Sequence, residues 1–260
     1  MSWLLADVPD GTDVLAHDTG RTVSAGAVVR GWREGSWPPQ SKELGQKIRV
    51  HFQETVMNSL SETRSKQTEL VGRRYPRTGS LRSGLDVEMR LMGRDDRDLF
   101  LAFAQSLPPD DLLYLRSDIS DPDVVDRWIE DIEEHRTVTV LAFNEGKLLG
   151  ETSLLHSAAD WTRHVGQIRL IVSPDTRSNG LGRFLAEEMF AIADTFGLEL
   201  LTAQMTSDQV GAQAVFRGLG FESIALLPGY VMDADGQRRD LLMMGYDLRK
   251  RGAPTSEASE

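Results

Sequence analysis

The residues best suited to chemistry form a glycine-rich turn, Arg177-Ser178-Asn179-Gly180-Leu181-Gly182. The run before it, residues 166–173 (GQIRLIVS), is rich in β-branched residues and predicts a strand that ends at Pro174. The residues after it predict a helix, because Leu181, Leu185, Met189, Ile192 and Phe196 recur at helical spacing. Backbone N–H groups at such a helix start lack intrahelical partners, and with the helix dipole they favour phosphate. The turn therefore predicts a site for a phosphorylated cofactor.

The spacing within this turn excludes two common phosphate motifs. A P-loop would need Lys and then Ser or Thr after the last glycine, and a dinucleotide-binding turn would need G-x-G-x-x-G. The turn reads R-x-x-G-x-G instead. It resembles the pyrophosphate-binding signature of the GNAT superfamily of N-acetyltransferases, Q/R-x-x-G-x-G/A after a strand ending in V-x-P, which here is Val172-Ser173-Pro174.

Two further segments extend the resemblance to about residues 86–250. Residues 212–221 (AQAVFRGLGF) resemble the superfamily's A-x-x-x-Y-x-x-x-G-F segment, with Phe216 in the tyrosine position. Residues 229–244 resemble the hairpin that closes small acetyltransferases. The resemblance implies an α/β fold, with a mixed, mostly antiparallel sheet, flanking helices and acetyl-CoA as the acyl donor.

The sequence pattern supports this element order. We expect strands at 86–92, 137–143, 147–156, 163–173, 199–205 and 222–227, and helices at 95–107, 122–134, 181–196 and 209–219. Asp121 is the expected N-cap of the second helix, with Pro122 in its first turn. Strands and helices in this order are typical of a mixed sheet, not a doubly wound one.

The resemblance also implies a set of cofactor-binding residues. The sheet is expected to open near Val172, where the pantetheine arm of the cofactor would add like an extra strand. The implied contacts are Ile171, Val172, Ser173, Arg177, Ser178, Asn179, Gly180, Leu181, Gly182, Arg183 and Phe216. No metal is expected.

Acetyl transfer to an amine needs a neutral amine and a protonated leaving thiolate. A lysine-like amine is unprotonated only about once in ~10³ encounters at neutral pH, so a base helps. Members of the superfamily often use a glutamate and a tyrosine, at positions that here hold Gln167 and Phe216. Gln cannot accept the proton and Phe cannot donate one.

Other residues are candidates for these roles. Glu151 is the candidate base, acting through water, and Gln167 could position that water or the amine through its amide. Tyr230 is the candidate acid. His156 and His164 are further candidates if they face the cleft, since histidine is the usual side chain for proton transfer near neutral pH. A solvated or ion-paired glutamate and surface histidines are the competing readings.

Composition narrows the class of protein. The 260 residues, 40% of them hydrophobic, suffice for one ordinary core. The chain has no cysteine, which excludes disulfides, a cysteine nucleophile and a zinc–thiolate site. The first residues (MSWLLADVPDGTD) do not resemble a signal peptide, and no apolar run approaches the ~20 residues of a membrane span. We expect a cytoplasmic protein without membrane contact.

The charge is divided unevenly along the chain. Residues 1–85 carry 12 Lys/Arg and 9 Asp/Glu, whereas residues 86–260 carry 17 and 31, so their net charges are +3 and −14. An acidic domain suits a cationic acceptor and argues against nucleic acid. Acidity for solubility is an equally good explanation. The change in charge predicts a domain boundary near Gly84.

The N-terminal extension, residues 1–85, has an unclear fold. Residues 13–32 suggest a hairpin around Asp18-Thr19-Gly20, and residues 42–70 can form a helix. Residues 64–82 contain six Lys/Arg and one acid, and we interpret them as a flexible basic connector. The extension is a possible protein contact, and residues 251–260 are expected to be a disordered tail.

The function expected from these features is transfer of an acetyl group from acetyl-CoA to a primary amine of a small molecule or a protein. Two alternatives stay open. One is a CoA-binding sensor or regulator without catalysis, and the other is an acyltransfer partner of a carrier protein that docks through residues 1–85.

Overall fold

The computed structural model describes residues 13–16, 21–24, 62–112, 117–156, 160–233 and 235–251. The contacts divide the chain into two units, Met1–Glu62 and Thr63–Glu260. In the first unit, strands β1 (Asp13–Ala16) and β2 (Arg21–Ser24) pair antiparallel, as expected for the hairpin. Residues 62–72 are helical. The rest of the helix expected at 42–70, and the expected tail beyond Arg251, lie outside the described residues.

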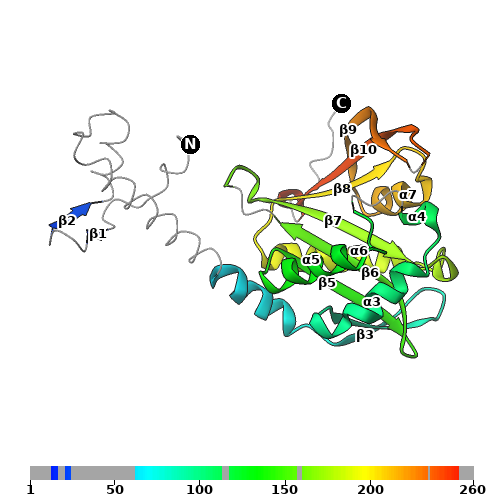
Figure 1. Ribbon diagram of the computed structural model, residues 1–260, viewed down its shortest axis with the longest axis horizontal. Coiled ribbons are helices and arrows are strands. Elements are labelled where there is room, and N and C mark those ends of the chain that lie inside the picture. Colours follow the sequence, from blue (N-terminus) through cyan, green and yellow to red (C-terminus); the bar gives the residue numbers. More distant parts are fainter. Residues whose placement is uncertain are drawn as a thin grey trace, which may run out of the picture. The chain divides into compact units, whose positions relative to one another are not determined.

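The second unit is built on one eight-stranded sheet (Figure 1). The strand order is β3-β4-β5-β6-β7-β8-β10-β9, and every neighbouring pair is antiparallel except β7 and β8. The strands are β3 (Arg77–Ser80), β4 (Asp86–Leu91), β5 (Thr137–Asn144), β6 (Lys147–His156), β7 (Val165–Val172), β8 (Leu200–Thr206), β9 (Glu222–Met232) and β10 (Arg238–Asp247). This confirms the mixed, mostly antiparallel sheet.

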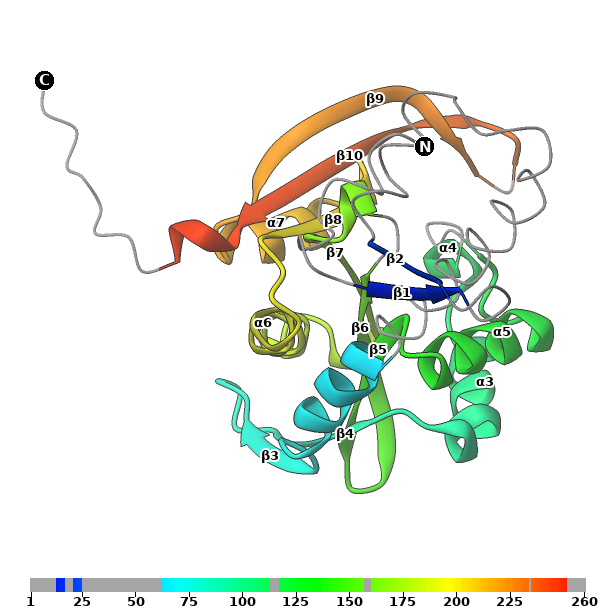
Figure 2. The same cartoon turned by 90° about the vertical axis from the view of Figure 1, so that its left-hand side faces the viewer.

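Helices cover both faces of this sheet (Figure 2). Helices α6 (Leu181–Thr195) and α7 (Val210–Gly218) pack on one face, where Leu185 and Met189 are in the core. Helices α3 (Arg97–Gln105) and α5 (Pro122–Glu133) pack on the other, in a core that contains Phe100 and Trp128. The described part of this unit also contains the helical residues 63–72, the short helix α4 (Pro109–Leu112) and the 3₁₀ turns η2 (Arg94–Asp96), η3 (Asp160–Thr162), η4 (Pro174–Thr176) and η5 (Leu248–Lys250). None of the described helices is long and apolar enough to span a membrane.

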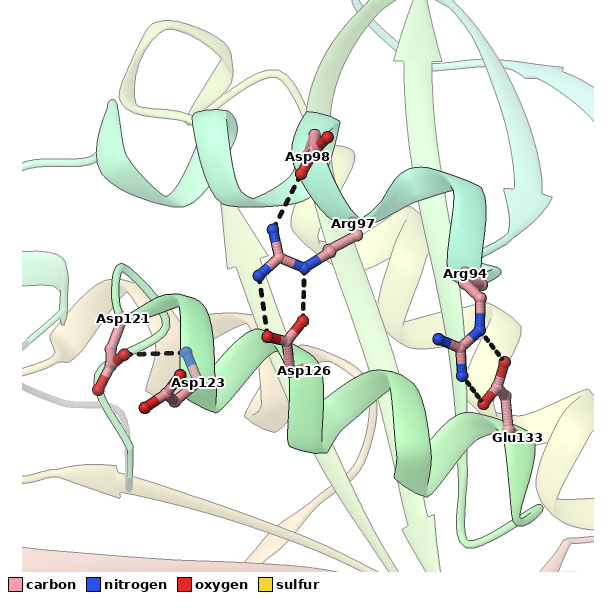
Figure 3. Close-up of polar contacts among 7 residues, drawn as sticks. All are labelled: Arg94, Arg97, Asp98, Asp121, Asp123, Asp126 and Glu133. Carbon is pink, nitrogen blue, oxygen red and sulfur yellow. Dashed lines mark hydrogen bonds and ion pairs between the residues drawn. The ribbon is translucent and has the colours of Figure 1, made fainter.

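Helix α5 is fixed at its start and along its length. The Asp121 side chain accepts a hydrogen bond from the Asp123 N–H at 2.9 Å, which confirms the expected N-cap. Two carboxylates of α5 pair with arginines near the start of α3. Asp126 pairs with Arg97, and Glu133 pairs with Arg94 (Figure 3). These contacts hold α5 beside α3, with Trp128 turned into the core between helix and sheet.

The sheet opens between its two parallel strands. Strands β7 and β8 pair only from Val165 and Leu200 to Ile168 and Ala203, so residues 169–172 have no β8 partner. The Ser173 N–H donates to the Leu149 carbonyl of the neighbouring chain segment at 2.8 Å. Because hydrogen-bonding direction alternates along a strand, the backbone groups of Leu170 and Val172 face the opening. The fold thus leaves an unpaired strand edge directly before the glycine-rich turn.

The basic segment at 64–82 is an ordered strap, not the flexible connector that we expected. Val71 is fully buried in the core beside α6, and β3 is the edge strand of the main sheet. The Tyr75 hydroxyl and the Arg77 guanidinium both donate to buried Glu188 of α6, at 3.0 and 2.8 Å. Burial, followed by the Glu188 charge, raises the pKa of Tyr75 well above its ordinary value. The compact unit therefore begins at Thr63, upstream of the expected boundary near Gly84.

Candidate active site

The glycine-rich turn presents a row of free backbone donors at the start of α6. Among the described residues, the N–H groups of residues 178–183 donate to no acceptor. Ser178 and Gly180 have positive φ angles, 65° and 88°, and this turn aligns the row. A Cβ atom on Gly180 would meet nothing within 4 Å, so the space in front of the turn is open. These residues fit a phosphate group through backbone contacts.

The two arginines of the turn are already engaged by protein groups. Arg177 pairs with Asp111 of α4, with a nitrogen–oxygen distance of 2.5 Å, and its guanidinium also donates to the Val172 carbonyl at 3.5 Å. Arg183 donates to Glu187 at 2.8 Å and to the Gly218 carbonyl at the end of α7 at 3.0 Å. Either guanidinium would have to share or exchange these partners to bind a phosphate.

Three expected cofactor residues have packing roles in the structure. Leu181 is buried, so only its backbone can reach a ligand. A Cβ atom on Gly182 would lie 3.5 Å from Leu170 Cδ2, which places this glycine against β7 and not toward the open space. Phe216 is buried, with its ring 5.0 Å from that of Phe221 in an edge-to-face arrangement.

The strand end offers different backbone groups from those that the sequence suggested. The Ser173 N–H is taken by Leu149, and the alternation turns the Ile171 groups toward β6, opposite Glu151. Val172 does face the opening, and so does Leu170, which we had not expected. The sequence alone does not predict this difference, because it depends on the register between β7 and β6.

Glu151 is a fully buried carboxyl group with a raised pKa. It is fully buried on β6, and Oε2 accepts a hydrogen bond from the Ser153 hydroxyl at 2.8 Å. Oε1 has no hydrogen-bond partner among the described residues. Burial raises the pKa of Glu151 to about 8, against the opposing effects of the Ser153 hydrogen bond and the Arg169 charge. Glu151 is therefore neither the solvated nor the ion-paired glutamate of the competing reading.

The other two catalytic candidates lie at different points of the sheet. Gln167 is half-buried and pairs with Leu155, four residues along β7 from Ile171, which is opposite Glu151. That separation is about 13 Å along the strand. Tyr230 is 68% exposed on β9, beyond the end of β8 and at the same end of the sheet as the turn. The pairing of β9 with β10 is irregular between Arg239 and Leu241. In this bulge the Gly229 N–H donates to the Asp240 carboxylate at 2.8 Å, and the two features set the direction of the segment that carries Tyr230.

The histidine candidates lie away from the opening. His156 ends β6 at its far end, packs 4.5 Å from the Phe196 ring, and burial lowers its pKa to about 4. His164 is exposed, and its carbonyl accepts from the Glu199 and Leu200 N–H groups. Trp161 is 84% exposed, whereas Trp128 is buried. Among the described residues, no cluster of His, Asp and Glu side chains is arranged to hold a metal ion.

Comparisons with known proteins agree with this geometry. Residues 101–221 match the family model described as the acetyltransferase (GNAT) family. A Bacillus subtilis protein provisionally named a phosphinothricin acetyltransferase is 28% identical over 82 residues, which are 32% of this chain and 50% of that protein. The chain thus spans about half the length of this curated relative.

Solved structures share the fold at lower identity. A Salmonella typhimurium protein, provisionally named an acetyltransferase and solved with its cofactor acetyl-CoA, has a TM-score of 0.56 at 21% identity, over 65% of this chain and 98% of its own. Spermidine N-acetyltransferase from Vibrio cholerae, solved with CoA and spermine, has a TM-score of 0.54 at 15% identity, over 63% and 96%.

The family model covers the segment from α3 through the glycine-rich turn to Phe221, and the solved structures share the fold. GNAT acetyltransferases use acetyl-CoA, and the open strand edge and free N–H groups of this chain fit that ligand. Residues 101–221 of this chain thus match the GNAT acetyltransferase family, and the compact unit shares the fold of solved GNAT structures.

Proposed function

We propose that this protein transfers the acetyl group of acetyl-CoA to a primary amine. The observation that carries the proposal is the adjacency of two backbone surfaces: the β7 edge at Leu170 and Val172, which pairs with no β8 residue, and the N–H groups of residues 178–183, which donate to none of the described residues. An extended amide-containing arm suits the first surface, and a pyrophosphate suits the second. CoA joins these two chemical features in one molecule.

The binding role falls mainly on backbone groups. Val172 and Leu170 would bind the pantetheine amides, and the N–H groups of Ser178 to Arg183 would bind the pyrophosphate, with Gly180 leaving the approach open. Arg177 and Arg183 would add charge after loosening their present pairs. Ile171, Ser173, Gly182 and Phe216 would shape the site through packing.

Three side chains would carry the chemistry around the thioester, which supplies an activated acetyl group. Glu151 would take a proton from the acceptor ammonium through a water molecule, since its carboxyl group is buried. Gln167, about 13 Å along β7 from the position opposite Glu151, would contact another part of the acceptor through its amide. The Tyr230 hydroxyl would give a proton to the departing thiolate sulfur as the new N–C bond forms and the C–S bond breaks. Because Tyr230 is exposed, it would regain that proton from solvent.

The acceptor is proposed as a cationic small molecule. The compact unit from Thr63 onward carries 23 Lys/Arg and 32 Asp/Glu, and its net charge of −9 attracts amines and concentrates them near the domain. The spermidine enzyme of Vibrio cholerae has a cationic acceptor on the same fold. The name of the Bacillus subtilis relative gives a different acceptor, the amino acid phosphinothricin. The two define the acceptor classes to compare.

An acceptor screen tests the proposal. Full-length protein is mixed with acetyl-CoA and, in turn, spermidine, phosphinothricin and a lysine-containing peptide, and free thiol is measured over time. We expect amine-dependent thiol release, with spermidine the best of the three. Acetyl-CoA binding without release for any amine would favour the alternative of a CoA-binding sensor, for which the Gln167 and Phe216 replacements speak.

A further inference from the structure

Glu151 is the last member of a buried chain of hydrogen bonds that begins on helix α5. The Trp128 indole N–H donates to the Thr139 hydroxyl at 3.0 Å, and the Thr139 and Ser153 hydroxyls are 2.8 Å apart. The Ser153 hydroxyl donates to Glu151 Oε2 at 2.8 Å. All four side chains are buried.

With Glu151 ionised, the direction of every hydrogen bond in this chain is fixed by its two ends, the indole that only donates and the carboxylate that only accepts. An indole N–H can only donate, and Ser153 has a single hydroxyl hydrogen, which it gives to Glu151. Thr139 must therefore accept from Trp128 and donate to Ser153. A chain whose dipoles all point the same way is strengthened along its length, and here it ends on one carboxylate oxygen.

This arrangement makes the two oxygens of Glu151 unequal. Oε2 accepts from Ser153, whereas Oε1 has no partner among the described residues. A proton on Oε2 would require the Ser153 and Thr139 hydroxyls to reverse their hydrogen bonds, so protonation is favoured on Oε1. The chain stabilises the ionised carboxylate and leaves one oxygen free to exchange a proton.

The surroundings of Glu151 supply little other charge. Its neighbours across the register are Leu141 on β5 and Ile171 on β7, and the helix above contributes the neutral Trp128. Arg169, from β7, is the charged group whose field reaches the carboxyl group. The tuning of Glu151 thus depends on burial, on Arg169 and on the hydroxyl chain.

We propose that Trp128, Thr139 and Ser153 are positioning residues that make Glu151 Oε1 the proton-accepting atom of the acetyltransferase. The inference rests on the proposed function. In the step, an N–H bond of the acceptor ammonium breaks, its proton passes through one water molecule to Oε1, and the nitrogen keeps the electron pair with which it attacks the acetyl carbon. Oε2 stays bound to Ser153 throughout.

The experiment uses full-length protein and two readouts. The first is the carboxyl stretch of Glu151, followed by infrared difference spectroscopy against pH and assigned with Glu151→Gln. The second is the pH dependence of kcat for the best amine. Thr139→Val, which is nearly isosteric, and Ser153→Ala each break the chain, and Thr139→Ser restores the hydroxyl. Thr152→Val is the matched control, because Thr152 is also buried on β6 but bonds the Arg169 carbonyl from the opposite face.

We expect Thr139→Val and Ser153→Ala to move both the infrared titration and the rising limb of kcat upward by about one pH unit, since they remove hydrogen bonding that favours the ionised form. Thr139→Ser and Thr152→Val should titrate like the wild type. An infrared titration unmoved in both broken-chain variants would overturn the proposal. So would unchanged turnover in Glu151→Gln. A protein that shows the infrared shift but no turnover with any amine would refute the proposed function and leave only the hydrogen-bond chain.

Discussion

At the scale of single residues, the burial of Glu151 has a consequence for stability as well as for chemistry. Its pKa is raised from 4.5 to about 8, so the folded state holds this proton more tightly than the unfolded chain does. Between these two values the free energy of unfolding must fall as pH rises, by up to about 1.4 kcal/mol per pH unit. We expect Glu151→Gln to remove this slope. Urea unfolding of both proteins at several pH values between 6.5 and 8 measures it.

The choice of pH window matters because of His156. Burial lowers its pKa to about 4, which gives a slope of the opposite sign below pH 6.5. Parallel stability curves for wild type and Glu151→Gln above pH 6.5 would show that Glu151 ionises normally.

The exposed Tyr230 hydroxyl makes the second residue-scale prediction. If it protonates the leaving thiolate, Tyr230→Phe should lower kcat roughly 10²-fold with little change in acetyl-CoA affinity. The exposed Tyr230 side chain packs little, so the variant should fold normally. Gln167→Ala should cost only about 10-fold, because an amide positions but does not transfer protons. Full turnover of Tyr230→Phe across pH would show that the thiolate leaves without this acid.

At the scale of elements, the strap is attached to α6 through one buried carboxylate. Tyr75→Phe removes its hydrogen bond to Glu188 and should lower the free energy of unfolding by about 1–2 kcal/mol, a normal value for a hydrogen bond to a charged group. Arg73→Ala is a matched control, since Arg73 makes only an exposed pair with Glu69 four residues away, which is worth about 0.5 kcal/mol or less. Equal losses in the two variants would mean that the strap is not held through Glu188.

The elements also show what the sequence can and cannot predict. Strands β4 to β8 and helices α3, α5, α6 and α7 follow from their apolar periodicity, to within a few residues. Strand β3 (RTGS) has no apolar alternation from which it could be predicted. It is an edge strand, and its register is set by pairing with β4. Strand β9 continues to Met232 through Pro228 and Gly229, where local signals end a strand.

The site was predictable to the same degree. The turn at 177–182 has a local spacing that marks it, whereas the orientation of Gly182 and the burial of Phe216 depend on packing between α6, α7 and β7. The polar run Glu151-Thr152-Ser153 lies inside an apolar strand, a pattern that is typical of buried side-chain hydrogen bonds. Its partners Thr139 and Trp128 are distant in sequence, so only the sheet register brings them together.

At the scale of the whole molecule, the compact unit should be separable at Thr63. A protein spanning residues 63–251 should fold and bind acetyl-CoA like the full chain, because it keeps Val71, β3 and the Glu188 contacts. One that begins at Ser83 loses Val71, Leu81 and an edge strand, and should unfold at lower temperature or be insoluble. Circular dichroism melts of the two compare them. Equal melting temperatures would place the boundary near Gly84, where the charge changes.

The central claim is that the turn at the start of α6 binds the phosphates of acetyl-CoA. Gly180→Asp tests it most directly. Asp is among the non-glycine residues found most often at a positive φ angle, so the strain of the substitution should still allow the domain to fold, while the carboxylate should repel a pyrophosphate. Gly197→Asp, at the other end of α6, is the control, since it also has a positive φ angle and open space and changes the charge equally.

Titration calorimetry of the two full-length variants with acetyl-CoA is the measurement. We expect Gly180→Asp to weaken binding at least ~100-fold, the effect of about 2.7 kcal/mol, and Gly197→Asp to bind like the wild type. Wild-type affinity in a folded Gly180→Asp protein would contradict the account.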